Sequence, residues 1–368
     1  MKIPKPIYKV ALGVAILCLL ASIVFMIMGD YPTAGPFLIT FFLALALGFR
    51  GYETLKGFAF TILIFAAVTA SMYYPAYFRE INGFELTVLI VPLLQLIMFG
   101  MGSQMSLKDF AGVIKMPKGV IIGVFCQFTI MPIVGVSIAT LFGFPPEIAA
   151  GIVLVGSSPS GLASNVMAYI SKANLALSVT LTAVATLLAP FTTPLLMKLF
   201  AGQFVPIDFL GMMWSIMKMV IFPIVAGLAF NKIAHGRAKW LDNAMPIISM
   251  GGIAVIITII TAEGRDSLLT IGLTLILAAF LHNTMGYFLG YWACRLFKMD
   301  ERSCRTVALE VGLQNGGLAS GIALEMGKVA TVGLAPAVFG PLMNITGSSL
   351  ATWWRGKPTG EEEKKEEG

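Results

Sequence analysis

Charged residues and cysteines are scarce in this chain. Only 12% of its 368 residues are Asp, Glu, Lys or Arg, whereas 57% are hydrophobic, so polar side chains are too few to cover a water-soluble domain. The four cysteines have no paired spacing, which predicts neither a disulfide framework nor a thiolate metal site: Cys18, Cys126, Cys294 and Cys304. The composition therefore predicts a polytopic membrane protein.

Apolar runs long enough to cross a bilayer recur from the N-terminus to Trp354. A hydrocarbon core of roughly 30 Å needs about 20 helical residues. A transmembrane barrel would instead alternate apolar and polar residues in segments of about ten. The predicted fold class is all-α, with twelve spans at residues 8–28, 34–49, 57–76, 85–103, 118–142, 147–170, 173–200, 208–233, 240–262, 267–296, 303–326 and 329–354.

The basic residues alternate between the two sides of these spans. Of 25 lysines and arginines, 20 fall in the termini and loops on the side of the N-terminus, with Arg305 counted as a loop residue, four fall on the other side, and Lys218 lies within a span. The positive-inside rule then predicts that both termini are cytoplasmic. This topology explains the formal net charge of +6, so no nucleic-acid partner is inferred.

Two predicted spans contain polar, glycine-rich interruptions: GSSPSGLASN at 156–165 and EVGLQNGG at 310–317. SGLAS (160–164) aligns with GGLAS (316–320), and FCQFT (125–129) echoes FLHNT (280–284). Five helix steps separate the copies, which predicts repeats of inverted topology. Interrupted helices at matching places are typical of secondary transporters, because unwound backbone and half-helix ends can bind ions and substrate. Close packing of two glycine-rich helices is the alternative.

Glu310 is the one acidic side chain predicted near the centre of a span. Because such a group costs about 3 kcal/mol on insertion scales, it needs a partner. A bound cation is the favoured partner, and proton uptake is the alternative. Neutral oxygen donors that suit a monovalent ion such as Na⁺ are available nearby: Gln127, Ser164, Asn165, Ser178, Thr182 and Gln314.

Polar residues within the predicted spans also have purely structural interpretations. Ser178 and Thr182 could bond to carbonyls of their own helix. Gln127 could join two helices, and His282 and Asn283 are expected to be hydrogen-bonded interior residues. Lys218 is expected to reach the membrane interface.

From Phe99 to Trp354 the chain resembles the bile acid:sodium symporter family. The motifs that carry the resemblance are MFGMG (98–102), QFTIMP (127–132), SPSGLASNVMAYISKANLALSVTLTA (158–183), EVGLQNGGLA (310–319) and NITGSSLAT (344–352). The resemblance implies two inverted five-helix repeats, arranged as a core domain and a panel domain, with 147–170 and 303–326 as broken, crossing helices. The expected parts are two additional N-terminal helices in 1–54, a symporter domain in 55–354 and a charged cytoplasmic tail in 355–368.

The resemblance also implies particular site residues. One sodium site would use Ser164, Asn165, Ser178, Thr182 and Glu310, and a second would use Gln127, Gln314, Glu310 and the backbone carbonyls of Val311 and Leu313. The substrate would face Gly161, Leu162, Asn315 and Asn344. Ser160 and Met343 depart from the pattern of the family, because the crossover there is more glycine-rich and the position before Asn344 can be more polar.

The expected function is sodium-coupled import of a small organic anion, such as one like a bile acid, pantothenate or a keto acid, across a bacterial inner membrane. Alternating access with two sodium ions is the expected mechanism. The chain is not expected to be an enzyme, because only one acid is centrally placed and the one intramembrane histidine has no evident catalytic partner. A proton-coupled organic anion transporter and a membrane-embedded anion-binding sensor are the alternatives.

Overall fold

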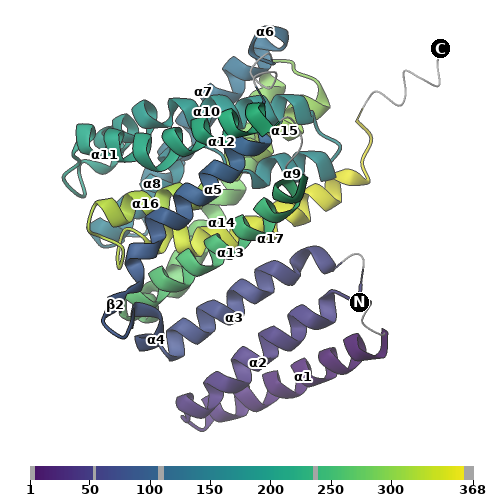
Figure 1. Cartoon of the computed structure of the whole chain (residues 1–368), viewed down its shortest axis with the longest axis vertical. Coiled ribbons are helices and arrows are strands. Elements are labelled where there is room, and N and C mark those ends of the chain that lie inside the picture. Colours follow the sequence, from purple (N-terminus) through teal and green to yellow (C-terminus); the bar gives the residue numbers. More distant parts are fainter. Residues whose placement is uncertain (1–4, 53–54, 107–111, 235–238, 360–368) are drawn as a thin grey trace.

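The computed structural model describes residues 5–52, 55–106, 112–234 and 239–359. Within these ranges the chain is helical apart from one small hairpin, formed by β1 (Glu80–Ile81) and β2 (Phe84–Glu85) (Figure 1). The predicted all-α class is therefore confirmed. Of the predicted tail, residues 360–368 lie outside the described ranges, as do residues 1–4 and 53–54 of the predicted N-terminal part.

The longer helices alternate with short connecting turns. In chain order they are α1 (Lys5–Ile27), α2 (Tyr31–Phe49), α3 (Ala59–Tyr73), α5 (Ile90–Gln104), α7 (Pro117–Leu141), α8 (Pro146–Ser157), α9 (Ala163–Ile170), α10 (Leu175–Leu196), α11 (Phe209–Ile216), α12 (Phe222–Ala234), α13 (Lys239–Glu263), α14 (Arg265–Leu296), α15 (Glu301–Gly312), α16 (Gly316–Glu325) and α17 (Leu334–Arg355). The short elements are α4 (Ala76–Arg79), α6 (Gly112–Lys115), the 3₁₀ turns η1 (Lys56–Phe58) and η2 (Leu86–Leu89), and the π-helical turns η4 (Met197–Ala201) and η5 (Met217–Ile221).

Among the described residues, eight helices are long and apolar enough to cross a membrane. They correspond to eight of the twelve predicted spans. The other four predictions fall on the interrupted pairs α8–α9 and α15–α16, on α13, and on α17. The structure thus supports a polytopic membrane protein, and the count of twelve spans stays a prediction.

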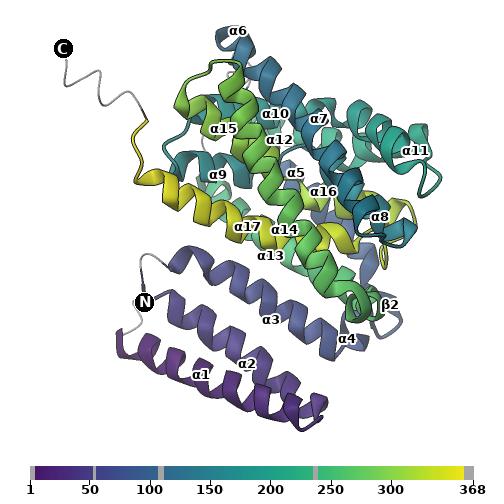
Figure 2. The ribbon, with the colours of Figure 1, turned by 180° about the vertical axis from the view of Figure 1, so that it is seen from behind.

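Helices α1, α2 and α3 form a layer beside the rest of the molecule (Figures 1 and 2). Helix α3 connects this layer to the remainder by packing against α13 and α17. Helices α1 and α2 can approach closely at Gly48 because glycine has no Cβ atom. A Cβ atom at this position would lie only 2.5 Å from the Leu12 side chain. The outer face of α1 exposes apolar side chains, as expected for contact with lipid: Ile16, Leu17, Leu20, Val24 and Ile27.

The remaining helices pack through small residues. A Cβ atom on Gly102 of α5 would lie 2.1 Å from the carbonyl oxygen of Ile224, and one on Gly227 of α12 would lie 2.2 Å from that of Phe99. The backbones of α5 and α12 therefore touch, as is common between helices in membranes. The 32-residue helix α14 runs along α7, α15 and α17 and so supports one side of the interrupted helices.

Both interruptions predicted from the sequence are present as breaks. Helix α8 ends at Ser157 and α9 begins at Ala163, while α15 ends at Gly312 and α16 begins at Gly316. The two unwound segments, 158–162 and 313–315, cross and pair in antiparallel fashion at Ser160 and Gln314. Two backbone hydrogen bonds hold this crossing: Gly161 N donates to Leu313 O at 2.9 Å, and Asn315 N donates to Pro159 O at 2.8 Å.

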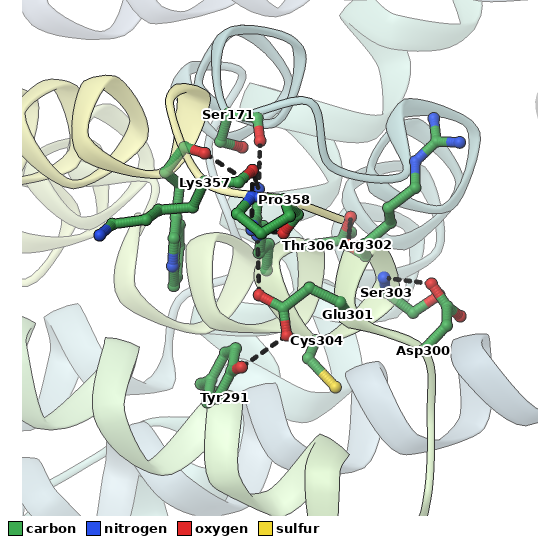
Figure 3. A network of polar contacts seen from close by, with 12 residues as sticks. Ser171, Tyr291, Asp300, Glu301, Arg302, Ser303, Cys304, Thr306, Lys357 and Pro358 are labelled. Atoms are coloured by element: carbon green, nitrogen blue, oxygen red, sulfur yellow. Dashed lines mark hydrogen bonds and ion pairs between the residues drawn. The ribbon is translucent and has the colours of Figure 1, made fainter. Parts of the chain in front are cut away.

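Arg305 lies in the first part of α15 and is only 1% exposed. Its guanidinium pairs with Glu301 at 2.8 Å and donates to four backbone carbonyls; Figure 3 shows this network and labels Glu301, Ser171, Lys357 and Pro358. These belong to Ser171, Trp354, Lys357 and Pro358. Counting Arg305 as a loop residue was wrong, because this helix buries it and ties it to the end of α9 and to the segment after α17.

Candidate cation site at the crossing of the broken helices

Glu310 lies on α15, two residues before that helix ends, and is 2% exposed. Its carboxylate accepts hydrogen bonds from three hydroxyl groups: Ser178 Oγ at 2.5 Å from Oε1, and Ser160 Oγ and Thr182 Oγ1 at 2.6 and 2.9 Å from Oε2. No lysine or arginine in the described ranges forms an ion pair with it. A buried carboxylate without a counter-charge is costly, so this place favours a cation.

Further oxygens surround the same hydroxyls. Asn165 Oδ1 lies 2.8 Å from Ser178 Oγ and 3.2 Å from Thr182 Oγ1, and Ser164 Oγ lies 3.3 Å from Thr182 Oγ1. Ser178 and Thr182 each have one hydroxyl hydrogen but contact two acceptor oxygens. The cluster therefore presents more lone pairs than hydrogens, which is the arrangement expected where oxygens coordinate a cation.

Three elements bring this cluster together. Ser164 and Asn165 lie in the first turn of α9, Ser178 and Thr182 lie one turn apart on α10, and Glu310 comes from α15. All five residues of the first predicted set thus meet. The structural alternative for Ser178 and Thr182 does not hold, because the described bonds of both hydroxyls point to Glu310 and Asn165, whereas Thr186 does bond back to Thr182 O.

The second predicted set lies on the other side of the crossing. Gln127 Nε2 donates to Gln314 Oε1 at 2.8 Å and to Ser158 O at 2.9 Å, and Gln314 Nε2 donates to Val311 O at 2.6 Å. Gln127 Oε1 is buried and has no hydrogen-bond partner among the described residues. Such an unpartnered buried oxygen fits a cation ligand. The described bonds of the Glu310 side chain all go to the first set, so they do not join it to these glutamines.

The residues predicted to face the substrate lie at or beside the crossing. Gly161 and Leu162 are in the first unwound segment, and Asn315 is in the second, where its side chain caps α16 by accepting from Leu318 N at 3.0 Å. A Cβ atom on Gly161 would lie 3.0 Å from Gln314 O, which explains the need for a small residue there. Asn344 lies on α17 and is half-buried.

Some contributing residues were not assigned a site role from the sequence. Ser160 was noted only as a departure, yet its hydroxyl reaches Glu310. Asn283 on α14 donates to Gly312 O at 2.7 Å, just as Gln127 on α7 donates to Ser158 O. The offset of 156 residues between SGLAS and GGLAS relates Gln127 to Asn283 and was the available signal for this pair. His282 is hydrogen-bonded to Met131 O at 2.9 Å, so the expectation that both residues are bonded within the interior is confirmed.

The chain also matches known proteins. Residues 91–271 match the Sodium Bile acid symporter family. YocS, an uncharacterized sodium-dependent transporter of Bacillus subtilis (strain 168), is 40% identical over 301 residues, which cover 82% of this chain and 91% of that protein. The ileal sodium/bile acid cotransporter of Oryctolagus cuniculus is 35% identical, over 67% of this chain and 72% of that protein.

A plant relative extends the range of similar proteins. The probable sodium/metabolite cotransporter BASS1, chloroplastic, of Arabidopsis thaliana is 34% identical over 71% of this chain and 65% of its own length. The relatives are sodium-dependent transporters and cotransporters by name, and their similarity extends well beyond the crossing. The chain accordingly belongs to the sodium bile acid symporter family and is a sodium-dependent membrane transporter, not an enzyme.

Proposed function

We propose that this protein is a sodium-coupled symporter that imports a small organic anion by alternating access. The observation that carries the proposal is the environment of Glu310, which is buried, lacks an ion-pair partner in the described structure and is surrounded by hydroxyl and amide oxygens. One carboxylate with several neutral oxygens suits a monovalent cation, because a divalent cation would recruit more carboxylates.

Two sodium ions are proposed. The first is held by Ser164, Asn165, Ser178, Thr182 and Glu310. The second is held by Gln127, Gln314, the carbonyls of Val311 and Leu313, and Glu310. The unpartnered Gln127 Oε1 supports the second position, because a buried oxygen that receives no hydrogen bond is stabilised by a cation.

The substrate is proposed to be a small organic anion that binds near Gly161, Leu162, Asn315 and Asn344. Helices α9 and α16 both begin at the crossing, so the partial positive charges of their N-termini favour an anion there. The names of the relatives supply the substrate classes to try first, since one is a bile acid cotransporter and another a metabolite cotransporter.

The proposed architecture is a pair of inverted repeats in a twelve-span chain with cytoplasmic termini, in a bacterial inner membrane. Three observations support the repeats. Each copy contains a broken helix, the broken segments pair in antiparallel fashion, and each copy has an amide side chain that donates to a carbonyl at its break, from Gln127 and from Asn283. The distribution of basic residues supports the orientation.

Coupling follows from the way the first site is assembled. A cation at Glu310 draws together α9, α10 and α15, and both unwound segments continue from those helices toward the substrate positions. Sodium binding therefore raises the affinity for substrate, and by linkage the substrate raises the affinity for sodium.

Replacement of Glu310 by Gln tests the function while nearly preserving the shape of the side chain. In proteoliposomes that contain the purified protein, wild type is expected to accumulate a labelled organic anion when sodium, but not potassium, is supplied outside. Glu310→Gln is expected to lose this uptake. Wild-type sodium-dependent uptake by Glu310→Gln would refute the site, and uptake driven by a pH gradient without sodium would establish proton coupling in its place.

A further inference from the structure

Ser160 is a residue for which the family resemblance implies no ligand role, because its position belongs to the more glycine-rich part of the crossover. In this chain Ser160 is 1% exposed, and its hydroxyl lies 2.6 Å from Glu310 Oε2. The distance is that of a strong hydrogen bond from a hydroxyl to a carboxylate. The Ser160 backbone meanwhile forms the antiparallel bridge with Gln314.

The side chain of Ser160 is not needed to hold the crossing. The bonds that join the two unwound segments are made by backbone groups, from Gly161 N to Leu313 O and from Asn315 N to Pro159 O. A glycine or alanine at position 160 would keep these bonds. The hydroxyl of Ser160 therefore acts on the Glu310 carboxylate and not on the crossing of the two segments.

Another serine of the same segment shows that such a contact is not inevitable. Ser158 is also buried, but its hydroxyl donates to Leu154 O, four residues earlier on α8, at 2.8 Å. Two hydroxyls two positions apart thus have different partners: Ser158 bonds back to the preceding helix α8, and Ser160 reaches across to α15. Ser158 therefore provides a matched control.

We infer that Ser160 is an additional cation ligand of this protein and tunes its affinity for sodium. A hydroxyl that donates its hydrogen to Glu310 still has lone pairs that face the same cluster. Ser160 can therefore stabilise the carboxylate when the site is empty and add an oxygen to the coordination shell when sodium is bound. This inference rests on the proposed sodium site at Glu310.

The test is a sodium titration of thermal stability in detergent, with potassium replacing sodium at constant ionic strength and pH. Ligand binding to the folded state raises the melting temperature with concentration, so the titration gives a half-saturating sodium concentration without a transport assay. The variants are Ser160→Ala, Ser160→Gly, Ser158→Ala and Glu310→Gln.

Both Ser160 variants are expected to raise the half-saturating sodium concentration by about tenfold, the loss expected for one hydrogen-bonding group on a charged partner. Ser158→Ala is expected to leave it unchanged. If Ser160→Ala lowers the melting temperature in potassium but keeps the wild-type sodium midpoint, Ser160 is only structural and the inference is wrong. If Glu310→Gln keeps the sodium response of wild type, the proposed site itself fails, which is a different outcome.

Discussion

The carboxylate of Glu310 and the amide oxygen of Gln127 are both buried, but in different ways. Glu310 receives three hydroxyl hydrogen bonds, whereas Gln127 Oε1 receives none from the described residues. A buried acceptor without a donor costs about 1–3 kcal/mol. Removal of the Glu310 carboxylate and removal of the Gln127 amide are therefore expected to affect sodium binding differently.

Substitution of Gln127 by Leu is expected to remove the second sodium ion and to leave the first. With one of two coupled ions lost, the dependence of uptake on sodium should become less steep, with the Hill coefficient falling from about 2 to about 1. Initial uptake rates measured against sodium concentration give this value. Gln95→Leu is the control, because the half-buried Gln95 on α5 donates to Lys218 O and has no contact with the proposed site among the described residues. An unchanged Hill coefficient in Gln127→Leu would contradict the second site.

At the scale of helices, α15 is held at both ends. Its C-terminal end stops at the crossing, where Asn283 binds the carbonyl of Gly312. Near its beginning, Arg305 joins α15 to the residue after α9 and to the segment that follows α17 (Figure 3). The ring of Tyr291 on α14 adds a further bond, since its hydroxyl donates to Glu301 Oε2 at 2.6 Å. This network positions the helix that carries Glu310.

Replacement of Arg305 by Met is expected to destabilise the protein by about 3 kcal/mol, because it leaves Glu301 without its closest partner and removes the donor from four backbone carbonyls, of which those of Ser171 and Trp354 belong to buried residues. A melting curve in detergent gives the effect. Arg295→Met is the control, since Arg295 lies 3.8 Å from the same Glu301 and is 46% exposed, and such pairs contribute little. Equal losses in the two variants would show that the carbonyl contacts of Arg305 do not matter.

At the scale of the whole molecule, the layer of α1, α2 and α3 stands apart from the crossing (Figures 1 and 2). The proposed ion and substrate residues lie between Gln127 and Asn344, on the elements that surround the two breaks. Helices α1 and α2 pack chiefly on each other and on α3. They supply none of the described contacts to Glu310.

Removal of α1 and α2 is therefore expected to leave the sodium response intact. Because the deletion removes an even number of predicted spans, it is also expected to keep the orientation of the rest of the chain. The sodium midpoint of thermal stability, measured for the shortened and full-length proteins, should agree. A loss of the sodium response in a shortened protein that still melts cooperatively would show that the added helices act on the site.

The sequence by itself determined the membrane class, the helical fold and the two breaks, and it singled out Glu310 as the acidic side chain within a predicted span. These are local properties: apolar runs specify spans, and glycine, proline and serine within a run specify an interruption. The first proposed ligand set could also be named in advance, because the motifs that resemble the family contain Ser164, Asn165, Ser178 and Thr182. Their meeting at Glu310, more than 125 residues away along the chain, is visible only in the fold.

Only the tertiary structure decided which of several serines reaches the carboxylate, that Arg305 is buried, and that the side-chain oxygen of Gln127 has no hydrogen-bond partner among the described residues. Ser160 and Ser158 have similar neighbours in sequence, yet the unwinding after Ser157 turns one toward α15 and the other back to α8. The burial of Arg305 depends on carbonyls 49 to 53 residues later in the chain. Such contacts arise from the packing of distant helices, which local residue patterns do not specify.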